Sequence, residues 1–493
     1  MYPLFRGHNT FQLLIMKKDS FIAIIMALTV TSAGAGNTTA ATRDNVWLEQ
    51  SLPAAWSDRT TAEDDDLFQT AAMPGGEWWR SFEDNVLDSL IDMGLQRNYD
   101  LRTAMNRIAS ARQAVGEASS SYYPRIGLSA GYSKARTAGA AEGHGIPSTD
   151  ASSFTLGANM SWEIDVFGRI TEQVRQSKSQ VELSRADFEG ARLTIAAEIA
   201  TQYVNLRKCQ MQLAIANEHI ASQKRVMEIS EARFEAGLVS KLDVAQAKTV
   251  YYSTLTDLPV LEAQCEAALN AIALLVAVYP EEITVLTGYN GKLPPYIQLV
   301  SAGVPADLLR RRPDIIAAER TIDINARAVG IAKKDYLPSL SLNGSVGTSA
   351  HRAGDLLGKN SLEYEIAPTL SWTLFEGFYR KYAVADARIK MQSAIEQYNY
   401  TVMNAVMEAQ NAMTTYKAAV KSIEYNRQAL EQSAESFDLS ISQYKEGLTS
   451  FTNVMNAQLS WLENANSNVE AQATALTDLI QLYRALGGST NPE

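Results

Sequence analysis

Residues 233–240 read RFEAGLVS and residues 443–450 read QYKEGLTS, so one turn-like sequence recurs after 210 positions. The pair Ser161-Trp162 recurs as Ser371-Trp372 at the same shift. The units of solenoid proteins are much shorter, about 20–50 residues. The chain is therefore interpreted as two tandem copies of one long unit, the product of a gene duplication.

Each turn is preceded by an unusually long helical stretch. Residues 169–235 and 378–446 contain no Pro and at most one Gly. At a rise of about 1.5 Å per residue, each stretch predicts a helix about 100 Å long. An apolar seam repeats every seven residues, at Ile199, Leu206, Leu213, Ile220, Met227 and Phe234 and again at Ile395, Val402, Ala409, Tyr416, Ile423, Leu430, Phe437 and Tyr444. This period predicts supercoiled packing against the shorter helices that return over 241–279 and 451–486.

Before its long helix, each unit carries two runs in which apolar and polar residues alternate. The runs cover 125–135 and 153–166 in the first unit and 338–348 and 363–375 in the second, where Pro368 interrupts the pattern. A shorter helix, at about 92–121 and 314–335, precedes each pair of runs. Alternation over about ten residues is typical of strands in a transmembrane barrel.

Four amphipathic strands do not close a barrel, so the chain is expected to oligomerise. Two copies would supply eight strands, which side chains fill, whereas three copies supply twelve and leave a lumen open. The expected fold is mainly α with a β-barrel part, in which a trimer closes a 12-stranded transmembrane barrel on an α-helical tunnel.

The N-terminus has the pattern of a secretory signal peptide at 1–35. Met16-Lys17-Lys18 precedes a short apolar run and then small residues, so Met16 is an alternative to Met1 as the start of translation. No later stretch approaches 18 unbroken apolar residues, so no transmembrane helix is expected. The expected domains are an N-terminal periplasmic segment at 36–91, repeat 1 at 92–280, a connector at 281–313, repeat 2 at 314–488 and a tail at 489–493.

Charge and composition exclude several functions. The net charge is −11 and no basic stripe is present, which argues against a nucleic-acid partner. The four histidines, at 8, 144, 219 and 351, are scattered, and no Cys/His spacing suggests a metal site. We find no catalytic constellation, so the protein is expected to be neither an enzyme nor a cofactor carrier.

The only two cysteines are expected to face each other. Cys209 lies 28 residues before Gly237, and Cys265 lies 28 residues after it. In a helical hairpin that turns at Gly237, both stand at the same height, about 42 Å from the turn. We expect either a disulfide, which an oxidising compartment permits, or two buried thiols packed as small apolar groups.

Several motifs resemble those of a known family. They are Trp78-Trp79 and Asp84 near the start, WEIDVFGR at 162–169, LLRRRPDI at 308–315 and LYRALGG at 482–488. In this order they resemble the outer-membrane efflux proteins related to TolC and OprM, and the OprM-like branch fits better. OprM-like relatives often carry a lipidated Cys near the N-terminus. Here no Cys precedes position 209, so the chain is expected to be unlipidated.

The resemblance implies a homotrimer in the bacterial outer membrane that extends into the periplasm. Such a duct works with a periplasmic adaptor protein and an inner-membrane pump as a tripartite efflux system. The expected function is passive exit of drugs or other small toxic compounds. Two alternatives stay open: an outer-membrane duct for protein secretion, and a periplasmic coiled-coil scaffold.

The resemblance also implies a gate at the periplasmic tip, where Gly237 and Gly447 form the turns. In the family a Leu, an Asp and an Arg follow the second turn and constrict the tunnel. Here Tyr444 and Gly447 match, but the three gate positions hold Thr452, Asn456 and Leu459. Asp243, in the first unit, is the expected alternative source of negative charge.

Overall fold

The computed structural model describes residues 51–53, 67–69, 77–138, 147–288, 291–295, 300–303 and 305–488, together with Leu48 and Trp56. The expected signal peptide lies outside these residues. The elements below all belong to one unit, Glu49–Glu493. In chain order they are β1 (Phe68–Gln69), η2 (Trp78–Phe82), α2 (Asn85–Arg97), α3 (Tyr99–Ser120), β2 (Arg125–Thr137), β3 (Thr149–Ile164), α5 (Arg169–Glu235), α6 (Lys241–Val276), α7 (Pro280–Thr287), β4 (Val300–Ser301), η3 (Pro305–Asp307), α8 (Leu308–Arg311), α9 (Pro313–Lys334), β5 (Ser339–Ala350), η4 (Ala353–Asp355), β6 (Leu362–Ser371), α10 (Tyr379–Lys445) and α11 (Phe451–Ala485).

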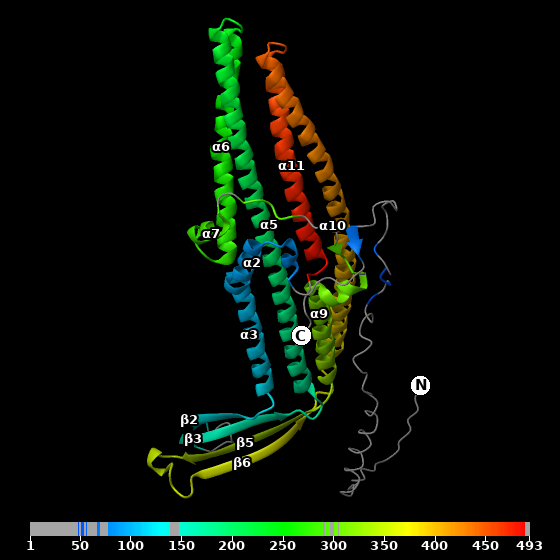
Figure 1. Cartoon of the computed structure of the whole chain (residues 1–493). Coiled ribbons are helices and arrows are strands. Elements are labelled where there is room, and N and C mark those ends of the chain that lie inside the picture. Colours follow the sequence, from blue (N-terminus) through cyan, green and yellow to red (C-terminus); the bar gives the residue numbers. More distant parts are fainter. Residues whose placement is uncertain are drawn as a thin grey trace, which may run out of the picture. The chain divides into compact units, whose positions relative to one another are not determined.

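The two long helices are confirmed to within one residue at each end. α5 and α10 each contain 67 residues. Figure 1 shows α5 running beside α6, and α10 beside α11, as two hairpins. Seam residues such as Ile199, Leu206 and Ile423 are buried, so the heptad pattern marks the packed face along most of both helices. Phe234, the last seam residue of α5, is the exception, because its side chain is 43% exposed near the turn. α11 also packs on α5, which joins the two hairpins.

The helix expected at 92–121 is wrong as one element, because the structure has two helices that meet at Asn98. The Asn98 side chain accepts hydrogen bonds from the N–H groups of Asp100 and Leu101, at 2.8 and 3.2 Å, and so caps α3. Its amide also donates to the carbonyl oxygen of Leu275, at 2.8 Å. A polar side chain that satisfies backbone groups on two elements thus interrupts a run with helical periodicity.

The four alternating runs form one antiparallel sheet in the order β2-β3-β5-β6. The register pairs Leu128 with Ala158, and Ala158 with Val346, so the apolar residues of all strands share one face. Polar residues share the other face, as where Glu163 pairs with Ser341. β2 and β6 are edge strands within the described residues.

The interruption expected at Pro368 is wrong. β6 runs through it, and Pro368 pairs with Leu342. Proline lacks an N–H group and is tolerated on an edge strand, where one side of the backbone has no ladder partner in the same chain. β6 ends at Ser371 instead of continuing to 375. The next residue, Trp372, donates from its indole N–H to the carbonyl oxygen of Tyr336, at 3.0 Å.

Two motifs that lie far apart in the sequence meet in the core beside α10. The Arg312 guanidinium donates to the carbonyl oxygen of Ala485 at 2.8 Å and forms ion pairs with Asp314 and Glu408, both at 2.8 Å. Gly487 has φ +90, and a Cβ there would lie 3.0 Å from the backbone of Arg312. The arginine motif at 308–315 and the C-terminal glycine motif therefore form one structural joint.

One helix meets the length and composition of a membrane span, although the sequence predicts no transmembrane helix. Among the described residues, α6 is long and apolar enough by length and composition, and 17% of the relevant window is buried. The expectation relied on unbroken apolar runs, which Asp257 and Glu262 interrupt. The helix also carries exposed apolar side chains, including Leu242 and Leu274.

Candidate functional site

The turns between the helices have the same geometry in both repeats. Gly237 has φ +70 and Gly447 has φ +77, as expected for left-handed positions. The N–H of Leu238 donates to the carbonyl oxygen of Arg233, and that of Leu448 to Gln443, both at 2.9 Å. These bonds close a glycine-terminated helix end. We call residues 233–243 and 443–453 together the tip.

The first turn restarts its helix with a capping box, and the second does not. Ser240 and Asp243 exchange side-chain and backbone hydrogen bonds, at 3.3 and 3.2 Å. Ser450, at the matching position, makes no such bond. The Asp243 carboxylate thus has a structural role in starting α6, and its contribution to tip charge stays a prediction.

Arg233 and Tyr444 tie the two hairpins together at the tip. Tyr444 is 3% exposed, and its ring lies 6.0 Å from the ring of Phe451. The Arg233 guanidinium lies 4.8 Å from the centre of the Tyr444 ring and donates to the carbonyl oxygens of Tyr444 and Lys445. These carbonyls end α10, where the helix dipole favours a cation. Tyr444 is therefore a packing residue in this chain, not an exposed one.

The other three predicted gate residues share an exposed face of α11. Thr452, Asn456 and Leu459 follow each other by four and three residues, which places them on one side of a helix. All three are exposed, while Val454 and Gln458 on the opposite side are buried. The structure brings these three together but separates them from Tyr444, and their role as a constriction stays a prediction.

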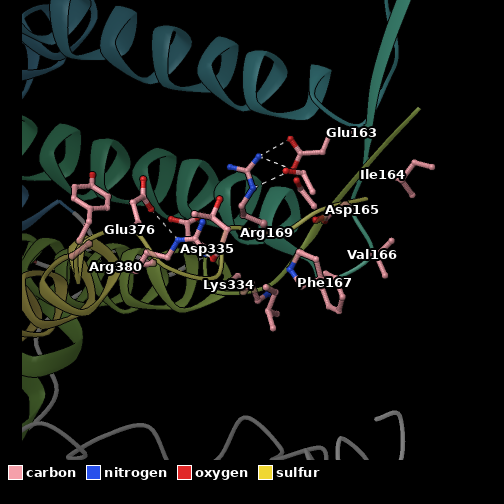
Figure 2. A pocket seen from close by; sticks show the side chains of 18 residues that line it. Glu163, Ile164, Asp165, Val166, Phe167, Arg169, Lys334, Asp335, Glu376 and Arg380 are labelled. Atoms are coloured by element: carbon pink, nitrogen blue, oxygen red, sulfur yellow. Dashed lines mark hydrogen bonds and ion pairs between the residues drawn. The ribbon is translucent and has the colours of Figure 1, made fainter. Parts of the chain in front are cut away.

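A second polar region lies where the sheet meets the helices. A cavity of about 390 Å³ lies there. Figure 2 shows the side chains that line it, several of them charged. Arg169 forms a two-pronged ion pair with Glu163, with contacts of 2.8 Å to both carboxylate oxygens. Because Glu163 lies on the polar face of the sheet, this pair connects that face to the start of α5.

Asp165 fixes the start of α5 beside this cavity. Its carboxylate accepts hydrogen bonds from the backbone N–H groups of Ile170 and Thr171 and from the Thr171 hydroxyl, at 2.7–3.0 Å. Burial opposes its ionisation, but the bonds from Thr171 and Ile170 outweigh burial and lower the pKa of Asp165 below its usual value. Asp165 therefore stays ionised and holds the junction between strand and helix.

The two cysteines are neighbours, as their equal distance from Gly237 predicts. Cys209 is buried, Cys265 is half-buried, and the structure contains both as free thiols. Burial and a hydrogen bond with Cys209 raise the pKa of Cys265 to about 12. The Cys209 thiol donates to the Leu261 carbonyl oxygen at 3.3 Å. The disulfide itself stays a prediction, and the structure corresponds to the alternative of two packed thiols.

We expect thiol titration to decide between these two states. A periplasmic chain with the disulfide should show no free thiol when it is denatured without reductant, and two after reduction. Two free thiols before reduction would refute the bond and leave only the proximity. The matched control is the Cys265→Ser variant, which must show one free thiol in both conditions.

Sequence reasoning missed the contacts of Arg233 and the pair Arg169–Glu163. In the repeat alignment Arg233 stands opposite Gln443, and this difference between otherwise matching turns was the available signal. Within the described residues, no group of three or more His, Cys, Asp or Glu side chains is placed to hold a metal ion.

Comparison with known proteins gives consistent results. The model of the family described as outer membrane efflux protein matches residues 90–278 and 304–488. Nodulation protein T of Rhizobium leguminosarum bv. trifolii is 26% identical over 449 residues, which are 90% of this chain and 93% of that protein. The pyoverdine export outer membrane protein OpmQ of Pseudomonas putida is 25% identical over 443 residues, which are 88% of this chain and 92% of that protein.

A solved structure agrees with the fold. The outer-membrane channel OprN superposes with a TM-score of 0.80 at 28% identity, over 88% of this chain and 97% of that one. The family model spans both repeats, the two long hairpins and all four strands of the sheet. The chain therefore belongs to the outer membrane efflux protein family and is an outer-membrane component of efflux, with the fold of a channel made of a membrane sheet and long periplasmic helices.

Proposed function

We propose that three copies of this chain form a passive exit duct for small molecules through the outer membrane. The observation that supports it best is the sheet, which has two edge strands and one continuous apolar face. Edges in a membrane must be paired, so β6 of one copy would pair with β2 of the next. Three copies then supply twelve strands, enough to surround an open lumen.

The duct is proposed to take its cargo from an inner-membrane pump through a periplasmic adaptor. Leu238 and Leu448 are 68% and 78% exposed at the tip, and an exposed apolar side chain at the end of each hairpin suits a protein contact. The named relative OpmQ exports pyoverdine. We propose small organic compounds, including drugs, as the cargo class of this chain as well.

The oligomeric state tests the duct directly. The mass of the detergent-solubilised particle, corrected for bound detergent, should be three times the mass of one mature chain. Its circular dichroism should be dominated by helix. A monomeric particle, or a spectrum dominated by strand, would contradict the proposed assembly.

Replacing both Gly237 and Gly447 by valine is expected to abolish export and leave insertion intact. Both residues have positive φ, which costs a side-chain-bearing residue about 1–2 kcal/mol and a β-branched one more. The valines should distort the two turns that present Leu238 and Leu448. Accumulation of a fluorescent drug in intact cells measures export, and heat-modifiable mobility of the membrane fraction measures insertion.

The control for this double variant is Gly116→Val in the middle of α3. A Cβ at Gly116 meets no atom within 4 Å, and the backbone there is ordinary helix. That variant should export normally. Normal export by the Gly237→Val/Gly447→Val protein as well would show that the turns do not matter for docking or opening.

Changing Asn456 to aspartate is expected to raise the preference of the duct for cations. If Asn456 of three copies lines a constriction, each new charge acts on a passing ion at a distance of ~8 Å. In water such a charge changes the local ion concentration about twofold. Reversal potentials in a salt gradient give the permeability ratio. Asn453→Asp, on a neighbouring side of α11, is the control. Equal permeability ratios for the two variants would show that position 456 does not line the constriction.

A further inference from the structure

A basic groove lies between α3, α5 and α9, away from the tip and from the cavity of Figure 2. Its volume is about 520 Å³. Six cationic side chains line it: Arg112, Arg175, Lys178, Arg185, Arg320 and Arg327. In a protein of net charge −11, such a gathering of cations is unusual.

The cations of the groove outnumber their partners. Arg175 and Arg327 share Glu172, at 3.0 and 3.3 Å. Arg185 pairs with Glu182 and Arg320 with Asp323. Arg112 and Lys178 have no partner among the described residues. Two carboxylates, Glu182 and Asp323, line the groove with the six cations, and Glu172 beside it also pairs with Lys334 at 3.4 Å. The groove therefore carries a net positive charge that favours an anion, and guanidinium groups suit the paired oxygens of a phosphate.

The position of the groove indicates where such a phosphate comes from. Arg175 and Arg185 are 6 and 16 residues after the start of α5, hence about 9 and 24 Å from the sheet. At 100° per residue they lie on the side of α5 opposite Arg169, which pairs with the polar face of the sheet. In the proposed duct that polar face lines the lumen, so the groove opens to the outside, just below the membrane.

We propose that this groove binds a phosphate group, as carried by an anionic phospholipid of the periplasmic leaflet. The proposal uses the duct only to orient the groove. Each cation near the surface raises the affinity for an anionic lipid about fivefold by electrostatic attraction. Removing Arg112 and Lys178 should therefore reduce lipid occupancy roughly tenfold or more.

The test compares the intact oligomer with its Arg112→Gln/Lys178→Gln variant. In nanodiscs of mixed composition, native mass spectrometry should show phosphatidylglycerol retained over phosphatidylcholine by the wild type and lost by the variant. Lys390→Gln/Arg427→Gln, two exposed cations on α10, should retain the lipid. Titration with inorganic phosphate distinguishes the sources: binding of phosphate without lipid enrichment supports the anion site and overturns the lipid. The proposal is overturned if the Arg112→Gln/Lys178→Gln variant retains as much lipid as the control variant and the wild type binds no phosphate.

A different observation, a buried polar layer, supports a second inference about the contact between the hairpins. Arg233 approaches Gly447, and His219 approaches Trp461, with ring centres 5.9 Å apart. Arg233 and His219 lie 14 residues apart on α5, and Gly447, in the turn before α11, lies 14 residues before Trp461, so α5 and α11 pack antiparallel. At the same level, Gln223 on α5 and Gln458 on α11 are each 3% exposed, and His219 is fully buried.

This layer lacks hydrogen-bond partners. Neither ring nitrogen of His219 and neither side-chain polar atom of Gln223 has a partner among the described residues, nor does Nε2 of Gln458. A buried polar group without a partner destabilises the packing around it, because it has lost its hydrogen bonds to water. Closer to the tip the same interface contains apolar residues such as Val226 and Val454. The layer is therefore a weak point in the contact between the two hairpins.

Among the described residues, no carboxylate on the surrounding helices is placed to stabilise the positive charge of a protonated His219. The charged groups near this level on the packed elements are exposed, and they include Glu218, Lys224 and Arg225 on α5, Asp257 on α6, Glu435 and Asp438 on α10 and Glu463 on α11. Burial alone lowers the pKa of His219 to about 4. Protonation of His219 is thus disfavoured while the helices are packed. Once they separate, the side chain regains the ordinary pKa of a histidine.

We infer that the layer of His219, Gln223 and Gln458 makes separation of the two hairpins sensitive to acid. The inference rests on the proposed duct. A histidine with a depressed pKa stabilises the packed state above its ordinary pKa of about 6.5, and this stability is lost as pH falls toward 4. When the pH falls from about 7.5 to 5.5, the ratio of separated to packed hairpins should therefore rise about tenfold per chain.

Conductance of the whole oligomer in planar bilayers tests this switch. The wild type should open more often at about pH 5.5 than at about 7.5, by about tenfold or more. His219→Leu should open rarely at both values, and His351→Leu, at an exposed histidine of the sheet loops, should respond like the wild type. Opening that ignores pH, or a His219→Leu variant that still responds, overturns the inference. An oligomer that never conducts contradicts the duct itself.

Discussion

Gly347→Val is expected to prevent assembly of the membrane part. Gly347 pairs with Gly157 across β3 and β5. A Cβ at Gly347 would lie 2.8 Å from the carbonyl oxygen of Leu156 and 2.9 Å from the Cα of Gly157. Both are backbone atoms that cannot rotate away, so the central pair of strands must separate. We expect a cost of about 3 kcal/mol, equivalent to a loss of assembled oligomer of more than a hundredfold.

Semi-denaturing electrophoresis of the membrane fraction measures this loss. The matched control is Gly354→Val, because a Cβ at Gly354 meets no atom within 4 Å and its φ is not positive. That variant should assemble like the wild type. A Gly347→Val protein that assembles normally would show that β3 and β5 are not paired in the register described here.

Arg312→Met is expected to have the largest effect in the helical part. The Arg312 side chain is 10% exposed and bonds the carbonyl oxygen that ends α11 as well as two carboxylates. Methionine preserves the volume but leaves the Ala485 carbonyl and Glu408 without their cation. Removing one partner of a buried pair costs about 3–5 kcal/mol, and water at Asp314 and Glu408 reduces this to about 2–3 kcal/mol.

The urea midpoint of the helical circular dichroism signal of the detergent-solubilised protein should fall accordingly. Arg427→Met is the control, because Arg427 also pairs with two carboxylates, Glu424 and Glu431, but on an exposed surface. Exposed pairs contribute about 0–1 kcal/mol, so its midpoint should change little. Equal midpoints for the two variants would contradict the role of Arg312 as a joint between the motifs.

The long helices, their turns and the four strands could be predicted because their signals are periodic and local. The heptad seam and the absence of proline define α5 and α10, and glycine with positive φ defines each turn. Alternation defines the strands, and internal repetition confirms the pattern twice in the same chain. The strand count also predicted a membrane oligomer. The family motifs then added the periplasmic adaptor and the inner-membrane pump, which no periodicity within one chain contains.

What could not be predicted depends on partners far apart in the sequence. Asn98 looks like an ordinary helix residue until its amide reaches Leu275 on α6. Arg233 differs from its repeat counterpart Gln443, yet nothing local shows that it contacts the end of α10. His219 lies within a helical pattern, and only the packing of α11 against α5 makes it buried without a partner. Such properties arise from tertiary contacts, which sequence periodicity does not encode.

Planar-bilayer recording of the purified, detergent-solubilised oligomer tests the central claim most directly. If the chain forms an exit duct, discrete ion-conducting steps should appear on addition of the wild-type oligomer and not with Gly347→Val material. A wild-type oligomer that inserts into the bilayer and never conducts would contradict the duct and favour a scaffold.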